Sequence, residues 1–263
     1  MTDEIQRIIL FTGGMDSTYS LLKELSKGHR IHALYVSSEN FPNNQSQKDA
    51  IEKIYRMIEK SELDETLLSL TISEASIPKQ VHGPFPSTGI SGLMMPCLFL
   101  PHSLYLLNEL MKNEIILSYT SEDDMVCTNA TMNNLENIQT GLESLASLMT
   151  FNRGPDFKLE VKTPLINKTK KEIMNELLDL CEEFSVGSKR TDIITNLWFC
   201  ENKYKLLCLR YRSKDNYCPS CKKMYPVLKD LEDNPISFME DFEDADEWER
   251  VKELRSESHE IQI

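Results

Sequence analysis

Short apolar runs alternate with amphipathic segments over the first 75 residues of the chain. The run QRIILF at residues 6–11 predicts a buried strand, and the runs HALYV and LLSLTI predict two more. A helix that stops near Gly28 is predicted between the first two runs, since its apolar positions share one face: Tyr19, Leu21, Leu22 and Leu25. A second helix is predicted in DAIEKIYRMIEKSEL. This order is typical of a parallel sheet with helices on both faces.

The rest of the chain continues the pattern after a predicted loop at residues 76–92, which is rich in Pro, Gly and Ser. Helices are expected at residues 97–112 and 134–148, and a further one in TKKEIMNELLDLCEEF. Strands are expected in EIILSYT and KLEVKTP. EIILSYT runs into Ser121-Glu122-Asp123-Asp124, which we place at the carboxyl edge of the sheet, where open α/β sheets hold their ligands.

Composition and charge narrow the class of protein. At 263 residues and 40% apolar, the chain can bury a sizeable core, and it lacks the run of about 20 apolar residues that a membrane span needs. Its N-terminus, MTDEIQR, is acidic before it is apolar, unlike a secretory signal, so we expect a cytoplasmic protein with no membrane partner. From residue 228 onward, 13 acids and 4 bases give −9 of the net −13, which leaves −4 before it. Neither part is basic, which argues against a nucleic-acid partner.

The clearest chemical signal is the segment that follows the first strand. Two glycines let the backbone approach an anion, and the helix that follows offers free N–H groups and a positive dipole end. Asp16 would cap that helix or lie near a magnesium ion that bridges phosphate and protein. The spacing matches neither a Walker loop nor GxGxxG. The residues predicted to bind the nucleotide are Phe11, Thr12, Gly13, Gly14, Met15, Asp16, Ser17 and Thr18.

The segment TGGMDST resembles the SGGxDS signature of the PP-loop ATP pyrophosphatases, and within them the chain is most similar to the 7-cyano-7-deazaguanine synthase (QueC) family. Three more segments carry the resemblance: Met95-Pro96 followed by EIILSYTSEDD, the stretch TPLINKTKKEI from Thr163, and Asn-Leu-Trp-Phe-Cys at residues 196–200. The resemblance covers about residues 6–228 as islands. It implies a Rossmann-like domain of the adenine nucleotide alpha hydrolase type, a twisted parallel sheet, followed by a small zinc-binding subdomain.

The segment TKKEI also has a physical interpretation. Thr169 is a suitable N-cap, and Glu172 three residues later completes a capping box. Lys170 would lie unfavourably at that helix start unless it faces an anion. The resemblance places it near the ATP phosphates, while the alternative is a solvated surface lysine. With ATP and Mg²⁺ as expected cofactors, catalysis is assigned to Asp16, Ser17 and Lys170, and Asp123 or Asp124 is a candidate magnesium ligand.

Four of the seven cysteines fall between residues 200 and 221. Cys218-Pro219-Ser220-Cys221 has the two-residue gap that lets two thiolates bind one Zn²⁺. The family completes its site with an earlier cysteine and a C-x2-C-x2-C run, but Asp215 stands where the middle cysteine belongs. Either Cys208 or Asp215 could complete the site, and with Cys208 the expected structural zinc ligands are Cys200, Cys208, Cys218 and Cys221.

These features predict three parts: an ATP-binding domain at 1–195, a zinc subdomain at 196–228 and an acidic tail at 229–263. The tail is expected to be helical and to dock on a second copy of the chain or on a partner protein. The resemblance implies an enzyme that adenylates a carboxylate, with 7-carboxy-7-deazaguanine as a candidate, releases pyrophosphate and forms an amide or nitrile with ammonia or another amine.

The acceptor half departs from the family. CTNATMNNLENIQ replaces its Tyr-Pro-Asp-Cys-Arg run, and Leu98-Phe99 replaces Arg-Asn, which by analogy favours a QueC-like protein of a phage or an anti-phage defence system. Two other functions stay open. One is a tRNA-thiolating enzyme of the same superfamily, with Cys97 as a reactive thiol. The other is a non-catalytic nucleotide- and zinc-binding adaptor that docks through its tail.

Overall fold

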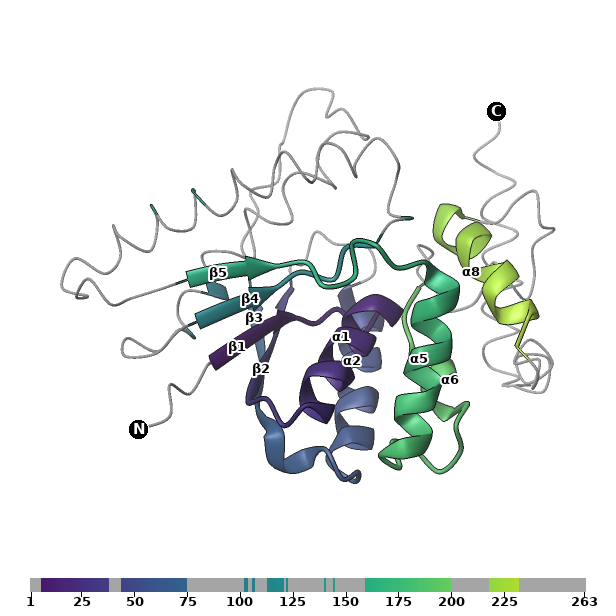
Figure 1. Cartoon of the computed structure of the whole chain (residues 1–263), viewed down its shortest axis with the longest axis horizontal. Coiled ribbons are helices and arrows are strands. Elements are labelled where there is room, and N and C mark those ends of the chain that lie inside the picture. Colours follow the sequence, from purple (N-terminus) through teal and green to yellow (C-terminus); the bar gives the residue numbers. More distant parts are fainter. Residues whose placement is uncertain are drawn as a thin grey trace.

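We describe the chain from a computed structural model, which is shown in Figure 1. The structure describes residues 6–37, 44–74, 102–103, 106, 113–120, 122, 140, 144, 159–199 and 218–231. The predicted loop at residues 76–92 and the acidic tail beyond residue 231 lie outside this set. Of the helices predicted at residues 97–112 and 134–148, only isolated positions are described.

Five parallel strands form one sheet in the order β3-β2-β1-β4-β5. The strands are β1 (Gln6–Leu10), β2 (Ile31–Ser37), β3 (Leu67–Glu74), β4 (Asn113–Ile116) and β5 (Leu159–Lys162). Each was predicted from its apolar run, so the α/β class with a parallel sheet is confirmed. β1 is central because Ile8 pairs with His32 of β2 on one side and with Ile115 of β4 on the other.

The position of β1 creates a switch point in the sheet. From β1 the chain builds outward to β2 and β3, and it returns to the other side of β1 to add β4 and β5. The strand order therefore reverses between β1 and β4. In open α/β sheets such a reversal marks the place where ligands bind, outside the carboxyl ends of the strands.

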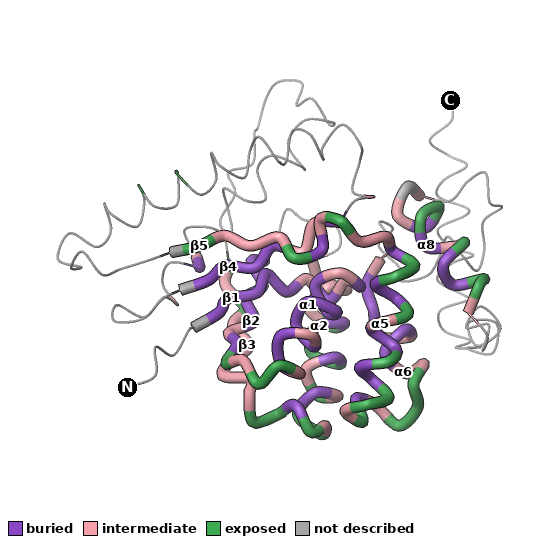
Figure 2. Tube along the Cα trace, in the orientation of Figure 1, coloured by how far each residue is buried: buried purple, intermediate pink, exposed green. Residues whose placement is uncertain are grey.

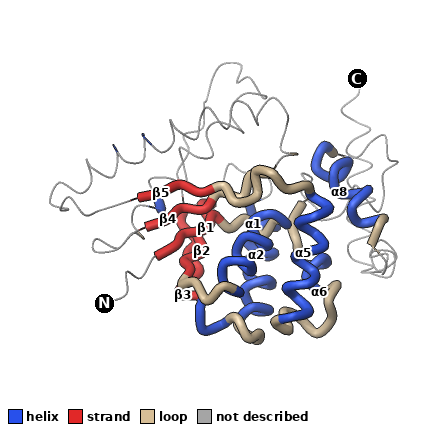
Figure 3. Tube along the Cα trace, viewed as in Figure 1, coloured by secondary structure: helices blue, strands red, loops and turns tan. Residues whose placement is uncertain are grey.

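The described helices α1, α2 and α5 lie on the same side of the sheet (Figure 3). The helical elements are α1 (Met15–Ser26), α2 (Asn44–Ile58), the 3₁₀ turn η1 (Asp64–Thr66), α5 (Lys170–Glu183), α6 (Asp192–Asn196) and α8 (Pro219–Lys229). Helix α1 packs along α5, and α2 packs on α6. The prediction of helices on both faces is therefore confirmed for one face, and it is not tested for the other by the part of the chain that the structure describes.

The core lies between the sheet and these helices (Figure 2). The predicted apolar face of α1 is buried, with Tyr19, Leu21, Leu22 and Leu25 all at most 1% exposed. Gly28 follows the end of α1 with φ of +74°, a conformation that favours glycine, which confirms the predicted stop. Edge strand β3 is only half-buried, and Ile72 on it is 43% exposed.

Helix α8 packs against α5, as Figure 1 shows. Its residues Met224, Val227 and Leu228 belong to the same apolar cluster as the α1 and α5 side chains. The zinc subdomain predicted for residues 196–228 is described only at its two ends, and both ends contribute to this common core. The position of its boundary stays a prediction.

A group of buried charges lies at the amino edge of the sheet, opposite the carboxyl ends. Arg7 on β1 is 9% exposed, and its Nε atom lies 2.8 Å from Glu114 of β4 and 3.5 Å from Glu24 of α1. Glu24 also pairs with Lys27 and with Nδ1 of His29 at 2.7 Å. These ion pairs join α1 to the two central strands. Among the described helices, none has the length and apolarity needed to cross a membrane.

Candidate active site

The loop between β1 and α1 is built around two glycines. Gly13 has φ of +70°, and a Cβ atom there would lie 3.1 Å from Cβ of Ala50 and 3.2 Å from the backbone N of Ile51. Gly14 is the N-cap of α1, and a Cβ atom there would lie 3.3 Å from the carbonyl oxygen of Trp198. Gly13 therefore needs glycine for its backbone angle and its packing, whereas a side chain at Gly14 would press on the backbone of Trp198.

Hydroxyl groups hold the loop in a closed turn. The backbone N of Thr12 donates to Oγ of Ser17 at 3.2 Å, and Oγ of Ser17 donates to the carbonyl of Gly14 at 3.1 Å. Oγ1 of Thr12 also lies 3.2 Å from Oγ of Ser17. The two hydroxyls thus meet at the start of α1, where the helix dipole favours an anion.

Lys170 reaches this loop from the other end of the chain. Its Nζ atom lies 2.5 Å from Oδ2 of Asp16, in the first turn of α1. Lys170 is 7% exposed, so the alternative of a solvated surface lysine is wrong. A cation at a helix start is disfavoured by the helix dipole, but here the carboxylate of Asp16 offsets this because it faces the ammonium. Helices α1 and α5 therefore bring an acid and a base together beside the turn.

A capping box fixes the first turn of α5. The N-cap Thr169 accepts a hydrogen bond from the backbone N of Glu172 through its side chain, and its own N donates to Oε2 of Glu172 at 2.8 Å. These bonds from Thr169 hold the pKa of the exposed Glu172 carboxyl below its ordinary value. The predicted capping box is confirmed, and it determines where α5, and hence Lys170, begins.

Glu122 has a role that the sequence did not reveal. Its Oε1 atom accepts a hydrogen bond from the backbone N of Lys170 at 3.2 Å, and its carbonyl accepts one from Nζ of Lys223 at 2.9 Å. The residue lies shortly after β4, as the predicted acidic run at the carboxyl edge requires. It connects that edge to the start of α5 and to the side chain of Lys223 on α8. Asp123 and Asp124, the candidate magnesium ligands, lie outside the described residues.

A second polar group flanks α1 one turn further along. The hydroxyl of Tyr19 donates to Oε2 of Glu176, whose other oxygen pairs with Nζ of Lys168, and that nitrogen lies 5.5 Å from the Tyr19 ring centre. Burial, together with the hydrogen bond to Glu176, raises the pKa of Tyr19 well above its ordinary value. Burial opposes the charge of Glu176, yet the bonds from Lys168 and Tyr19 outweigh it and lower the pKa of that carboxyl. This group attaches α5 to α1.

Some predicted loop residues have side chains that face the interior. Phe11 is 1% exposed, Met15 is 3% exposed and both belong to the apolar core, so a ligand would meet only their backbone. Thr18 is 0% exposed, and its N–H donates to the carbonyl of Gly14 within the helix. Thr12, Asp16 and Ser17 are thus the loop residues with polar side chains at the turn. Trp198 was assigned no role from the sequence. Its backbone N–H, rather than its indole N–H, donates to the carbonyl of Gly13 at 2.8 Å.

The structure describes two of the four predicted zinc ligands. Cys218 is the N-cap of α8, and its Sγ atom accepts a hydrogen bond from the N–H of Cys221 at 3.4 Å. This turn suits a pair of thiolates that share one metal. Cys200 and Cys208 lie outside the described residues, and within the described part no three His, Cys, Asp or Glu side chains form a metal site. The four-cysteine site stays a prediction.

Comparison with known proteins agrees with this geometry. The family described as "Queuosine biosynthesis protein QueC" matches residues 6–223, which include the glycine turn, Lys170 and the Cys218–Cys221 pair. No curated protein matches the chain. The family match spans most of the 263 residues. The chain therefore belongs to the QueC family of PP-loop ATP pyrophosphatases.

Proposed function

We propose that this protein activates a carboxylate with ATP and transfers the acyl group to ammonia or another amine. Membership of the QueC family implies an ATP-using enzyme. The observation that supports the proposal best is the meeting of Ser17, Asp16 and Lys170 at the carboxyl end of β1. A helix start, two hydroxyls and a buried ammonium together suit a polyphosphate at the switch point of the sheet.

In the first step, a carboxylate oxygen of the substrate attacks the α-phosphorus of ATP. The bond between the α-phosphorus and the bridging oxygen breaks, and pyrophosphate leaves with the bonding electrons. The hydroxyls of Thr12 and Ser17 and the N–H groups of the turn would hold the leaving phosphates. Lys170 would balance their charge, since its ammonium is already held within reach of the turn by Asp16.

In the second step, the amine attacks the carbonyl carbon of the acyl-adenylate. AMP leaves with the electrons of the carbon–oxygen bond, and the nitrogen loses a proton to give an amide. A nitrile would require a further activation of the amide oxygen in the same way. For the acid we propose 7-carboxy-7-deazaguanine, which fits the QueC family, although the rewritten region around residues 127–139 also allows another acid.

Magnesium fits the donor set of the loop. Asp16 supplies a carboxylate oxygen of the kind that Mg²⁺ prefers, and it lies in the first turn of α1 beside the hydroxyls of the turn. When bound with ATP, the metal would neutralise charge on the phosphate oxygens during attack. Asp16 would then have two roles, to orient Lys170 and to hold the metal. Zn²⁺ at the cysteine pair of α8 would be structural.

The test is pyrophosphate release by the purified protein with ATP, Mg²⁺ and candidate acids, with Ser17→Ala compared with Ser26→Ala. Ser17 lies in the turn, whereas Ser26 lies in the last turn of the same helix and donates to the carbonyl of Lys23. We expect Ser17→Ala to lower the rate at least about tenfold, since one hydroxyl contact to the leaving phosphates is lost, and Ser26→Ala to retain it. Equal rates in the two variants would exclude this turn as the ATP site.

A further inference from the structure

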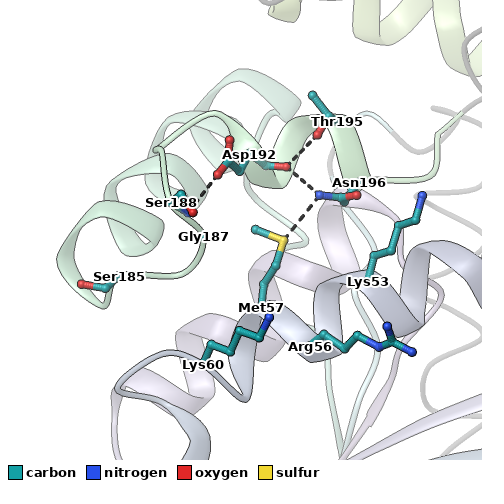
Figure 4. Close-up of a pocket in the computed structure, with 10 residues that line it drawn as sticks. All are labelled: Lys53, Arg56, Met57, Lys60, Ser185, Gly187, Ser188, Asp192, Thr195 and Asn196. Carbon is teal, nitrogen blue, oxygen red and sulfur yellow. Dashed lines mark hydrogen bonds between the residues drawn. The ribbon is translucent and has the colours of Figure 1, made fainter. Parts of the chain in front are cut away.

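A cavity of about 490 Å³ lies between α2 and the segment that connects α5 to α6 (Figure 4). None of the residues that line it belongs to the glycine turn or to the Asp16–Lys170 pair. The lining residues are Lys53, Arg56, Met57, Lys60, Ser185, Gly187, Ser188, Asp192, Thr195 and Asn196. The proposed adenylation does not use this cavity.

One wall of the cavity is cationic. Lys53 and Arg56 lie three residues apart on α2, and Lys60 follows shortly after the end of that helix at Ile58, so that all three line the cavity (Figure 4). Arg56 pairs with Glu52 at 2.5 Å, but both side chains are more than 60% exposed, and such a surface pair is weak and easily exchanged. This wall is conspicuous in a chain whose net charge is −13.

The acid among the lining residues does not neutralise that wall. Oδ2 of Asp192 accepts hydrogen bonds from the backbone N of Ser188 at 2.8 Å and from the backbone N of Lys189 at 2.9 Å. Figure 4 shows Asp192 turned toward Ser188, on the wall opposite Lys53, Arg56 and Lys60. Its charge is therefore stabilised within its own turn, and the cavity keeps an excess of positive charge.

The opposite wall of the cavity is held in shape by the turn at Gly187 and by hydrogen bonds of α6 side chains. Gly187 has φ of +98°, a backbone angle that favours glycine, and a Cβ atom there would lie 2.8 Å from Cε of Met57, so the turn lies against the Met57 side chain of α2. The side-chain N of Asn196 bridges the carbonyl of Asp192 at 2.9 Å and Sδ of Met57 at 3.5 Å. The hydroxyl of Thr195 donates to the same carbonyl at 2.9 Å. These contacts join α6 to α2 and shape the cavity before any ligand binds.

We propose that this cavity is a second ligand site, which binds a small phosphorylated molecule. Its volume falls in the range of ligand pockets, about 300 to 1,000 Å³. Three cations on one wall suit the charge and multiple acceptor oxygens of a phosphate group, and the arginine can bind two of those oxygens at once. Ser188, Thr195 and Asn196 supply polar groups for the rest of the molecule. A cavity of this volume in a chain with a net charge of −13 fits a small molecule better than a nucleic-acid strand.

The experiment is titration calorimetry of the full chain with ribose 5-phosphate, while a non-hydrolysable ATP analogue and Mg²⁺ saturate the first site. We expect one binding event per chain with ribose 5-phosphate and none with ribose, which lacks the charged group. The double variant Lys53→Glu and Lys60→Glu should weaken binding at least about tenfold, because two charge-assisted contacts become repulsive.

Lys48→Glu is the matched control, since Lys48 is on α2 with Lys53 but pairs with Glu74 outside the cavity. It should bind ribose 5-phosphate as the unchanged chain does. Equal loss in both variants, or no heat that depends on the phosphate group, would overturn the proposal. A single-stranded RNA that binds through Lys53 and Lys60, while ribose 5-phosphate does not, would overturn it in favour of a nucleic-acid site. Because the ATP site is filled throughout, either result is independent of the proposed adenylation.

Discussion

The ammonium of Lys170 lies 2.5 Å from the carboxylate of Asp16, although 154 positions separate the two residues in the sequence. The contact joins the first turns of α5 and α1, the two helices that start beside the glycine turn. The lysine side chain is 9% exposed and the aspartate side chain is 23% exposed. A charged pair this close to the predicted phosphate site positions both groups before the substrate arrives.

Replacement of this lysine gives the first prediction. Lys170→Ala should lower ATP-dependent pyrophosphate release at least about a hundredfold, because the cation that balances the leaving phosphates is lost. Lys171→Ala removes the same charge one position later, where the lysine is 61% exposed and pairs with Asp230. Its rate should stay within about twofold of the unchanged chain. A similar loss in both variants would show that the site responds to overall charge rather than to Lys170.

The second prediction concerns the shape of the turn. Gly13→Ala should destabilise the fold by about 2–4 kcal/mol, from the strain of a left-handed residue and from overpacking against Ala50 and Ile51. Gly28→Ala provides the comparison, since Gly28 has φ of +74° but no atom within 4 Å of an added Cβ. It should cost only the backbone strain, about 1–2 kcal/mol. Urea unfolding of both variants measures the difference, and equal losses would contradict a packing role for Gly13.

The third prediction concerns pH and the buried charges at the amino edge of the sheet. Burial opposes the charge of Glu24, but hydrogen bonds from Lys27 and His29 outweigh it and lower the pKa of that carboxyl below its ordinary value of 4.5. A lowered folded-state pKa means that the group stabilises the fold above pH 4.5 and that this contribution disappears as the pH falls through the folded-state pKa.

Glu24→Gln should therefore reduce the free energy of unfolding near neutral pH and show a smaller further loss on acidification than the unchanged chain. Asp179→Asn is the control, since Asp179 is 70% exposed and pairs only at the surface with Arg190. Denaturant melts across this pH range provide the measurement. Parallel pH profiles for the unchanged chain and Glu24→Gln would refute the linkage.

The fourth prediction concerns metal. The purified protein should contain about one zinc ion per chain, and Cys218→Ser or Cys221→Ser should lose it and become less stable. Cys181→Ala is the control, because burial raises the pKa of the Cys181 thiol to about 12 and keeps it protonated in the core. Elemental analysis for zinc and thermal melts distinguish the proposed zinc ligands, Cys218 and Cys221, from Cys181, whose replacement should leave the zinc content unchanged. A metal-free protein with an unchanged melting temperature in Cys218→Ser would rule out the zinc site.

The local parts of this site follow from the sequence alone. Apolar runs and amphipathic periods predict β1, α1, β2, β3 and α5, because burial on one face imposes a period on neighbouring residues. The glycine turn and the capping box of Thr169 with Glu172 are predictable because each depends only on residues that are close together in the sequence. The resemblance to the family was likewise carried by such short segments.

The tertiary structure decided which distant residues meet. Lys170 had two interpretations until the packing of α5 on α1 placed it against Asp16. The contact of Glu122 with the start of α5 and that of Trp198 with Gly13 have no signal in residue spacing. The cationic cavity likewise forms only where α2 meets the turn at Gly187. Local periodicity determines elements, whereas a site made from several elements depends on the register in which they pack, and no single segment encodes that register.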